Sequence, residues 1–386
     1  MTITCKIFTQ RAPLKPLTLA KQFICSWKNN SHAQVFSGIQ PTGLPHLGNY
    51  FGAIEQWIKL ANERTTTVIN SDNSQSLVSL TKPIYAIVDV HSYSSSKTVF
   101  GQQLYESILD TLASLMALGL NQNNCTLIRQ SDVVEHFYLD CVLDNFVTTN
   151  RLTSMTQFKD KTRNEAKKSI SSPTPNGLLT YPILQAADIL LYRAQLVPVG
   201  EDQVQHLELA RDIARKFNLK VDCDLFPRPL PLFNLSEHAR RVRSLRDPWK
   251  KMSKSDVDHK AYVSPLESAE LIREKFKKAL TDSISAVYYD PQERPAISNL
   301  LRIHHLATGL SFDQIRDNYL RLESAQYKLE LADIIIERFR DARRLYSELR
   351  ADKSYLESTF RDGYACVKPM VEETVSKVKY LLGSLR

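Results

Sequence analysis

The sequence predicts an α/β protein: a Rossmann-like, doubly wound parallel sheet followed by a C-terminal α-helical domain. Short apolar β-forming runs alternate with amphipathic helical patterns as far as about residue 258, which is typical of parallel strands joined by right-handed crossovers. From residue 259 onward the chain keeps helical periodicity and loses strand character. We therefore expect an α/β domain over residues 34–258 and a helical domain over 259–386.

The first strand, over residues 35–39, is expected to end near Gln40 at a Pro/Thr/Gly turn. An apolar pattern at helical spacing begins at Gly48. His46 and Asn49 therefore flank a helix N-terminus, where unpaired backbone N–H groups attract anions. An ordinary glycine-rich turn would contain the same four residues, His-Leu-Gly-Asn.

Two further strands, at residues 84–88 and 125–128, are expected on either side of a helix over 104–118. The polar residues 63–83 before them show little periodicity, so we expect a surface loop there. Ligands of parallel sheets bind beyond the carboxyl ends of the strands. Three polar side chains would meet at that edge: Gln40, His91 and Gln130.

Residues 132–195 form a predominantly helical insertion in this prediction, with a break at 169–177. Beyond the break, Tyr181, Gln185 and Asp188 are spaced four and three residues apart and so share one helix face. Asp188 stands between Ala-Ala and Ile-Leu-Leu, so it should be partly buried, and a buried carboxylate needs a partner. A structural Arg, a backbone cap or an N–H group of a ligand would each serve.

A second strand-to-helix junction follows the insertion. A short strand at residues 196–199 leads into Gly200, Glu201 and Asp202, and a helix with an apolar face begins at Val204. Acidic residues are favoured in a first helical turn, so a capped structural helix is one explanation of this segment and a ligand site is another.

Residues 251–255 read Lys-Met-Ser-Lys-Ser and follow a strongly basic stretch at 240–250. Two ammonium groups three residues apart, with hydroxyls between and after them, can converge on one polyphosphate. A solvated basic loop is the simpler alternative.

Five helical patterns are expected in the C-terminal domain, at residues 267–280, 297–308, 312–322, 330–349 and 369–382. We expect them to form a bundle packed on the sheet. Exposed Lys and Arg side chains there can follow an RNA backbone, although acidic residues balance their charge.

Composition narrows the class of protein only slightly. The 386 residues carry a net charge of +8, but residues 1–54 hold five basic and no acidic residues, and the remainder is nearly balanced. The six cysteines form no Cys-x-x-Cys pair, which favours a reducing compartment and argues against structural zinc or a disulfide framework; we expect no metal site in the protein. No apolar run is long enough to span a membrane.

Residues 1–33 are basic, free of acidic residues and rich in Ser, Thr and Cys. This composition is typical of an organellar transit peptide, although Lys outnumbers Arg; a disordered tail is the alternative. We expect a mitochondrial presequence, and hence a location in the mitochondrial matrix, because the fold should need none of these residues.

The segments His46-Leu-Gly-Asn49 and Lys251-Met-Ser-Lys-Ser255 together resemble the HIGH and KMSKS signatures of class I aminoacyl-tRNA synthetases. Further segments make the chain, from about residue 34 to its C-terminus, similar to the bacterial and mitochondrial tryptophanyl-tRNA synthetases. These segments are Phe36-Ser-Gly-Ile-Gln-Pro-Thr-Gly43, Met155-Thr-Gln-Phe-Lys159, Leu179 to Tyr192, and Val197-Pro-Val-Gly-Glu-Asp-Gln203. Asn49 stands where the general signature has His, as is usual in this branch.

The resemblance implies an ATP site beside a tryptophan pocket. The residues implied to bind ATP are Gln40, Gly48, Asn49, Gly200, Glu201, Asp202, Val242, Lys251, Met252, Ser253, Lys254 and Ser255. Those implied to line the tryptophan pocket are Phe36, Gly38, Gln40, His91, Tyr181, Gln185, Asp188, Val197, Val199 and Gln203, with Asp188 accepting the indole N–H. The implied catalytic residues are His46, Asn49, Lys251 and Lys254, with Lys159 and Lys161 approaching the phosphates.

The implied reaction joins L-tryptophan to tRNA(Trp) through tryptophanyl-adenylate, with release of pyrophosphate. ATP is a substrate in it and arrives with Mg²⁺. No side-chain nucleophile is needed, so the residues should act by positioning and by neutralising charge. The resemblance also implies an anticodon-binding helical domain and a homodimer with residues 132–155 at its interface.

Three alternatives stay open. The pattern Tyr181-x3-Gln185-x2-Asp188 also resembles the tyrosine-binding helix of tyrosyl-tRNA synthetases. A nucleotidyltransferase would share the His-x-Gly-Asn turn, although residues 251–255 and the helical C-terminal region favour a synthetase. A catalytically silent RNA-binding relative would have no chemical need for both signatures and Asp188.

Overall fold

The computed structural model describes residues 32–69, 75–94, 100–166, 175–234, 236–254, 256–319 and 321–385. The predicted presequence lies outside this range up to residue 31. Ala33 is fully buried and forms a parallel bridge with Leu80. The expectation that the fold uses none of residues 1–33 is therefore wrong at Ala33.

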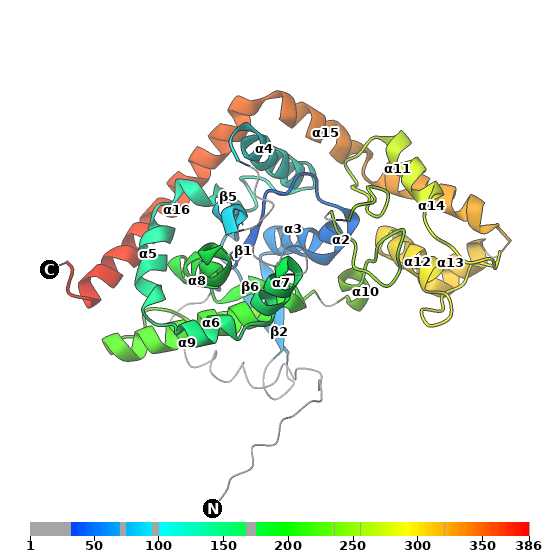
Figure 1. Ribbon diagram of the computed structural model, residues 1–386. Coiled ribbons are helices and arrows are strands. Elements are labelled where there is room, and N and C mark those ends of the chain that lie inside the picture. Colours follow the sequence, from blue (N-terminus) through cyan, green and yellow to red (C-terminus); the bar gives the residue numbers. More distant parts are fainter. Residues whose placement is uncertain are drawn as a thin grey trace, which may run out of the picture.

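A parallel sheet lies at the centre of the molecule (Figure 1). Its strands β1 (Phe36–Ile39), β4 (Ile84–Ile87) and β5 (Thr126–Arg129) are hydrogen-bonded in the order β1-β4-β5. A parallel bridge from Val35 to Leu196 places β6 (Leu196–Pro198) on the other side of β1, and β7 (Leu230–Leu232) pairs with β6. The chain therefore reverses its direction of winding beside β1, which confirms the predicted doubly wound sheet and puts a ligand crevice at that point.

Helices cover both faces of this sheet, and β4 shows how its side chains divide between them. Tyr85 and Ile87 join one apolar core with α3 (Glu55–Glu63) and α4 (Gln102–Ala117). Ile84 and Ala86 join a second core with α5 (Glu135–Asp144), α8 (Asn176–Leu191) and α9 (Val204–Val221). Alternate residues of a strand point to opposite faces, so a strand covered on both faces is apolar throughout.

The segment 63–83 is not a loop. It forms an antiparallel hairpin of β2 (Thr65–Ile69) and β3 (Gln75–Ser79), with residues 70–74 outside the described part of the chain. Its strands consist largely of Thr, Ser, Val and Leu, and Val78 is their one buried apolar residue within the described range. A hairpin that buries so few apolar side chains lacks the polar/apolar alternation by which a strand is recognised.

The insertion before β6 is helical, as predicted. It consists of α5, α6 (Thr149–Thr153), α7 (Thr156–Ala166) and α8, and α8 packs between α5 and α9. Most of the predicted break at 169–177 lies outside the described residues. Strand β7 was missed because Pro231 stands in the middle of its three residues, and an internal Pro argues against a strand.

The chain beyond β7 is helical, but the boundaries differ from those expected. After α10 (Glu237–Arg240), the helices are α11 (Ala269–Lys277), α12 (Pro295–Thr308), α13 (Phe312–Tyr319), α14 (Ser324–Arg338), α15 (Arg340–Ala351) and α16 (Lys353–Leu381). The single helix expected over 330–349 is divided at Phe339. Pro369 lies inside α16 rather than at its start, on an exposed side where water can hydrate the carbonyl left unpaired.

The last two helices return to the sheet. In Figure 1, α15 and α16 run from the helical region back along α4 and β5. Arg350 of α15 is paired with Glu106 (2.8 Å) and Asp110 of α4. Helices α11 to α14 pack mainly on one another, whereas α15 and α16 pack on α4 and β5; the predicted domain limit at residue 258 stays a prediction.

Candidate active site

His46 is the N-cap of α2 (Leu47–Asn49), which continues through the π-helical turn η2 (Tyr50–Ile54) into α3. Its Nδ1 accepts the backbone N–H of Asn49 at 3.0 Å, and the Asn49 side chain accepts the backbone N–H of His46 at 3.2 Å. Burial, together with the charges of Lys254 and Lys251, lowers the pKa of His46 to about 3. The ring is therefore neutral, and its remaining proton is on Nε2, where it can be donated.

The two signature segments touch each other. A Cβ at Gly48 would lie 3.0 Å from the His46 ring and 3.5 Å from Cβ of Met252, so a glycine lets the lysine loop rest on the helix start. Lys254 Nζ reaches across to donate to the carbonyl oxygens of Gly43 (2.8 Å) and Thr42 (3.3 Å). Burial lowers the pKa of Lys254 to about 8. Ser255 lies outside the described residues.

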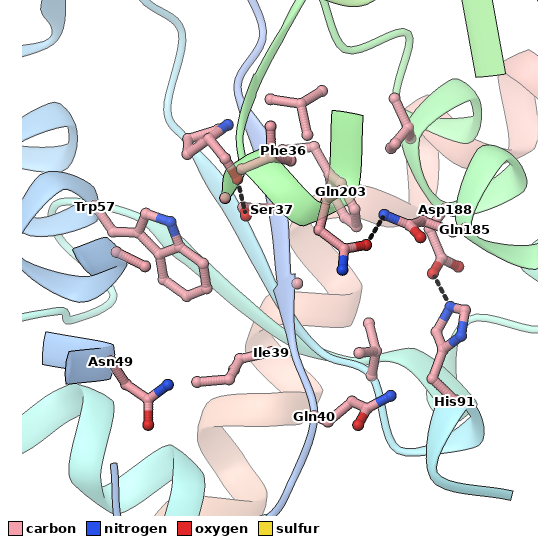
Figure 2. Close-up of a pocket in the computed structure, with 18 of the residues that line it drawn as sticks. Phe36, Ser37, Ile39, Gln40, Asn49, Trp57, His91, Gln185, Asp188 and Gln203 are labelled. Carbon is pink, nitrogen blue, oxygen red and sulfur yellow. Dashed lines mark hydrogen bonds and ion pairs between the residues drawn. The ribbon is translucent and has the colours of Figure 1, made fainter. Parts of the chain in front are cut away.

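A cavity of about 470 Å³ opens beyond the carboxyl ends of β1 and β6, where the winding reverses. Figure 2 shows Asp188 and His91 at one end of it. Asn49 and Trp57 lie at the other end, across β1. The predicted site residues that line the cavity are Phe36, Gly38, Gln40, Asn49, His91, Tyr181, Gln185, Asp188, Val197, Val199, Gly200, Gln203 and Lys254.

Asp188 is 2% exposed; Gln130 and His91 form hydrogen bonds with its carboxylate, and His136 lies within ion-pair distance of it. Gln130 Nε2 lies 2.9 Å from both oxygens, His91 Nε2 lies 3.0 Å from Oδ2, and His136 Nδ1 lies 2.7 Å from Oδ1. Burial alone would raise the pKa of Asp188, but the histidines outweigh it and hold that pKa well below its ordinary range. A buried carboxylate is thus kept ionised at the end of the cavity.

A chain of polar side chains forms the wall next to Asp188. The Tyr181 hydroxyl lies 2.9 Å from Gln157 Oε1 and 3.1 Å from His206 Nε2. Nδ1 of His206 lies 2.8 Å from Gln203 Oε1, which also accepts from Gln185 at 3.4 Å. Burial, aided by the negative charge of Asp202, raises the pKa of Tyr181 to about 12, so the hydroxyl keeps its proton. Side chains tied together in this way give the pocket a defined shape.

Phe36, Val197 and Val199 form an apolar wall of the cavity, and an aromatic stack backs it. Phe36 packs on Tyr192 with the ring centroids 5.0 Å apart and the planes at 16°. The Tyr192 hydroxyl lies 2.8 Å from His136 Nε2, so the same tyrosine supports the apolar wall and the histidine that holds Asp188.

Several implied ATP residues do not line this cavity. Val242 and Met252 are 2% exposed, and Lys251 is on the surface. Glu201 is paired with Arg240 at 2.6 Å. The others outside the cavity lining are His46, Gly48, Asp202 and Ser253. Lys159 is exposed, and the side chain of Lys161 lies outside the described part.

Several residues of the site do not follow from the sequence, and His206 of the polar chain is one of them. His136 precedes Asp188 by 52 positions and carries no motif, so only the packing of α5 on α8 reveals it. Gln157 lies in the segment 155–159 that carries the family resemblance, but nothing in the sequence gives it a role. Trp57 belongs to the apolar helical pattern that begins at Gly48, yet it lines the cavity while stacking on Tyr85, and its buried Nε1 has no hydrogen-bond partner within the described ranges.

A sequence model of the family described as "tRNA synthetases class I (W and Y)" matches residues 28–340. The chain belongs to this family. The tryptophan–tRNA ligase of Rickettsia conorii is 40% identical to it over 349 residues, covering 90% of this chain and 98% of its own.

Two solved structures are similar over almost their whole length. The tryptophanyl-tRNA synthetase of Campylobacter jejuni, complexed with ADP and tryptophan, is 28% identical with a TM-score of 0.74, covering 91% of this chain and 99% of its own. That of Mycoplasma pneumoniae is 28% identical with a TM-score of 0.70, covering 92% and 98%.

As a class I tRNA synthetase, the chain is an ATP-dependent ligase, and the site has the polarity such a reaction needs. One end of the cavity holds a fixed negative charge and the other a desolvated ammonium and a helix N-terminus. Within the described ranges, no group of three or more His, Cys, Asp or Glu residues can hold a metal ion. No helix in that part of the chain is long and apolar enough to cross a membrane.

Proposed function

We propose that the protein is a tryptophan–tRNA ligase of mitochondrial translation, which activates L-tryptophan with ATP and transfers it to tRNA(Trp). Tryptophan is proposed as the amino-acid substrate because the ionised Asp188 lies at one end of the cavity. Gln130, His91 and His136 hold this charge in place, and each carboxylate oxygen takes two of their contacts. An N–H donor of the substrate would share an oxygen with these groups or replace one of them; an indole provides such a donor, and the phenyl ring of phenylalanine lacks it.

The apolar wall fits the same substrate. Phe36, Val197 and Val199 line the same cavity as Tyr181 and Gln203. An aromatic amino acid gains from burying its ring against such a wall. The relatives named tryptophan–tRNA ligase support this assignment.

In the first step the tryptophan carboxylate attacks the α-phosphorus of ATP; the new C–O–P bond replaces the bond to pyrophosphate, which leaves. In the second step a ribose hydroxyl of tRNA attacks the acyl carbon, and AMP leaves with the adenylate oxygen. Lys254, Lys251 and the neutral His46 stabilise the charge on the phosphates, and Gln40 and Asn49 orient the nucleotide. Mg²⁺ arriving with ATP would share that neutralisation, held mainly by phosphate and water oxygens.

The test is ATP–pyrophosphate exchange by the full-length protein with tryptophan, tyrosine or phenylalanine, beside Asp188→Asn. We expect exchange with tryptophan alone, reduced by about a hundredfold in the variant because an amide offers one acceptor oxygen and turns an N–H toward the three side chains around it. Exchange with tyrosine instead would favour the tyrosyl alternative. No exchange with any of the three would leave the silent RNA-binding relative.

The location and the assembly are part of the proposal. The acid-free, basic composition of residues 1–33 supports import into the mitochondrial matrix, and a reporter fused to residues 1–32 that stays in the cytosol would contradict it.

Val134 (64% exposed) and Phe137 (36% exposed), within the predicted interface 132–155, support a homodimer. A monomeric mass in sedimentation equilibrium would exclude it.

A further inference from the structure

We propose that Trp249 is a stacking platform for an unpaired nucleotide at the 3′ end of tRNA; this inference rests on the proposed function. Trp249 lies two residues before Lys251, and its side chain is 70% exposed. It is one of three tryptophans in the chain, beside Trp27 and Trp57. Isolated aromatic residues are common on protein surfaces. The proposal therefore depends on how rigidly the backbone holds Trp249 and on which charged groups surround it.

The loop that carries Trp249 is stiff. Residues 243 and 251 close it by an antiparallel bridge, and Asn299 of α12 holds both the N–H (2.8 Å) and the carbonyl (3.0 Å) of Arg243. The backbone N–H of Trp249 donates to Asp247 Oδ1 at 3.1 Å, and the backbone carbonyl of Trp249 accepts from Arg243 NH1 at 3.3 Å. The backbone is thus tied on both sides of an indole left in solvent. A platform fixed before binding loses little conformational entropy when a partner stacks on it.

The charge around Trp249 selects the partner. Residues 240–251 contain six basic residues and a single acidic one, Asp247. Four of the six form surface ion pairs with carboxylates, as Lys250 does with Asp247 (2.9 Å) and Arg246 with Asp258 (3.1 Å). Exposed pairs of this kind are weak, and phosphate oxygens can replace the carboxylates. An aromatic face within a basic surface fits single-stranded nucleic acid, whose bases stack while its phosphates are neutralised.

The position of Trp249 beside the cavity indicates which part of the nucleic acid it would contact. In Figure 1 the yellow-green segment between α10 and α11, which contains this loop, runs past α2. Met252 touches the start of α2, and Lys254 lines the cavity. The nucleic acid that must bring a ribose hydroxyl to this cavity is the unpaired 3′ end of tRNA. Trp249 would therefore stack on a base next to the one that reacts.

The test compares Trp249→Ala and Trp249→Phe with a matched control, Val257→Ala, since Val257 is 96% exposed and lies on the other side of the lysine motif. We expect Trp249→Ala to raise KM for tRNA in aminoacylation by about tenfold and to leave tryptophan-dependent ATP–pyrophosphate exchange within about twofold. Trp249→Phe should restore KM to within about threefold, because a phenyl ring also stacks, and Val257→Ala should change neither reaction.

An unchanged KM for tRNA in Trp249→Ala, or an equal loss of exchange, would overturn the inference. Absence of exchange in the unaltered protein would instead overturn the proposed function. A second measurement uses a Trp27→Phe protein, in which Trp249 is the exposed fluorophore and Trp57 is buried. Its emission should be quenched by tRNA and much less by tRNA lacking the unpaired 3′ nucleotides; equal quenching by both would contradict the assignment to the 3′ end.

Discussion

Two charged side chains at opposite ends of the cavity are held in different ways. Asp188 keeps its charge because Gln130, His91 and His136 contact it inside the protein. Lys254 contacts neutral oxygens of Thr42 and Gly43, and the described residues give it no carboxylate partner. The carboxylate is therefore a fixed charge, which suits the recognition role proposed for it, whereas the ammonium could transfer to a phosphate in the proposed reaction.

The lowered pKa of Lys254, about 8, makes ATP use sensitive to pH. As pH rises through about 8, the free enzyme loses the ammonium charge, so kcat/KM for ATP in the exchange reaction should fall by about tenfold per pH unit. In Lys254→Arg the guanidinium stays charged, and the profile should be flat to about pH 10 at a lower plateau. A flat profile in the unaltered protein would contradict the prediction.

Unfolding cannot account for such a loss. Between pH 8 and 10.5 the folded state binds fewer protons at Lys254 than the unfolded state, so this group increases the free energy of unfolding as pH rises through that window. As pH rises through this window, activity should therefore fall while the contribution of Lys254 to stability rises. Thermal unfolding measured at each pH tests the change in stability.

At the scale of elements, the fit of α16 on β5 depends on a single glycine. A Cβ at Gly363 would lie 1.9 Å from the carbonyl oxygen of Leu127, closer than any real contact. A glycine inside a helix costs about 1 kcal/mol relative to alanine, so its presence here reflects the close approach of helix and strand.

Gly363→Ala should therefore lower the free energy of unfolding by about 2–3 kcal/mol, because the clash outweighs the gain in helix propensity. Gly52→Ala is the matched control: it also lies in a helix, and its Cβ would meet only the carbonyl of Ala239 at 3.6 Å. Urea unfolding of the two variants measures the difference. Equal stabilities would show that α16 can move away from β5 at no cost.

At the scale of the whole molecule, Arg338 joins the helical region to the signature helix. It stands at the end of α14, donates to Glu55 of α3 at 2.9 Å and to the carbonyl of Ala307 in α12, and lies 5.7 Å from the ring centroid of Phe51. Burial raises the pKa of Glu55, and the Arg338 charge offsets part of that effect. One side chain thus ties α12 and α14 to the helix that begins at His46.

Arg338→Ala should lower the free energy of unfolding by about 1–2 kcal/mol, since the pair is only partly exposed (32% and 39%) and Glu55 would lose its partner. Arg340→Ala, whose pair with Glu337 is 66% and 67% exposed, should cost less than about 0.5 kcal/mol. A double-mutant cycle with Glu55→Gln measures the coupling, expected at about 1 kcal/mol. Equal effects of Arg338→Ala and Arg340→Ala would refute this link.

Local sequence determined much of this protein. The alternation of apolar runs and helical periods was sufficient for the parallel sheet, because a strand covered on both faces must be apolar. The polar residues at the strand ends and the spacing of Tyr181, Gln185 and Asp188 were sufficient to indicate part of the cavity, since one helix face and the carboxyl ends of strands follow from local geometry; of the two signatures, Asn49 and Lys254 line it.

Tertiary structure alone decided the rest. The ionisation of Asp188 depends on His136, which reaches it only through the packing of α5 on α8. The return of α16 to the sheet depends on Gly363, which carries no periodic signal, and the hairpin of β2 and β3 buries only Val78 within the described range, too little to mark a core face in the sequence. The charge state of a residue and the surface on which a helix packs depend on neighbours that are distant in the sequence. A local sequence pattern contains no information about those neighbours.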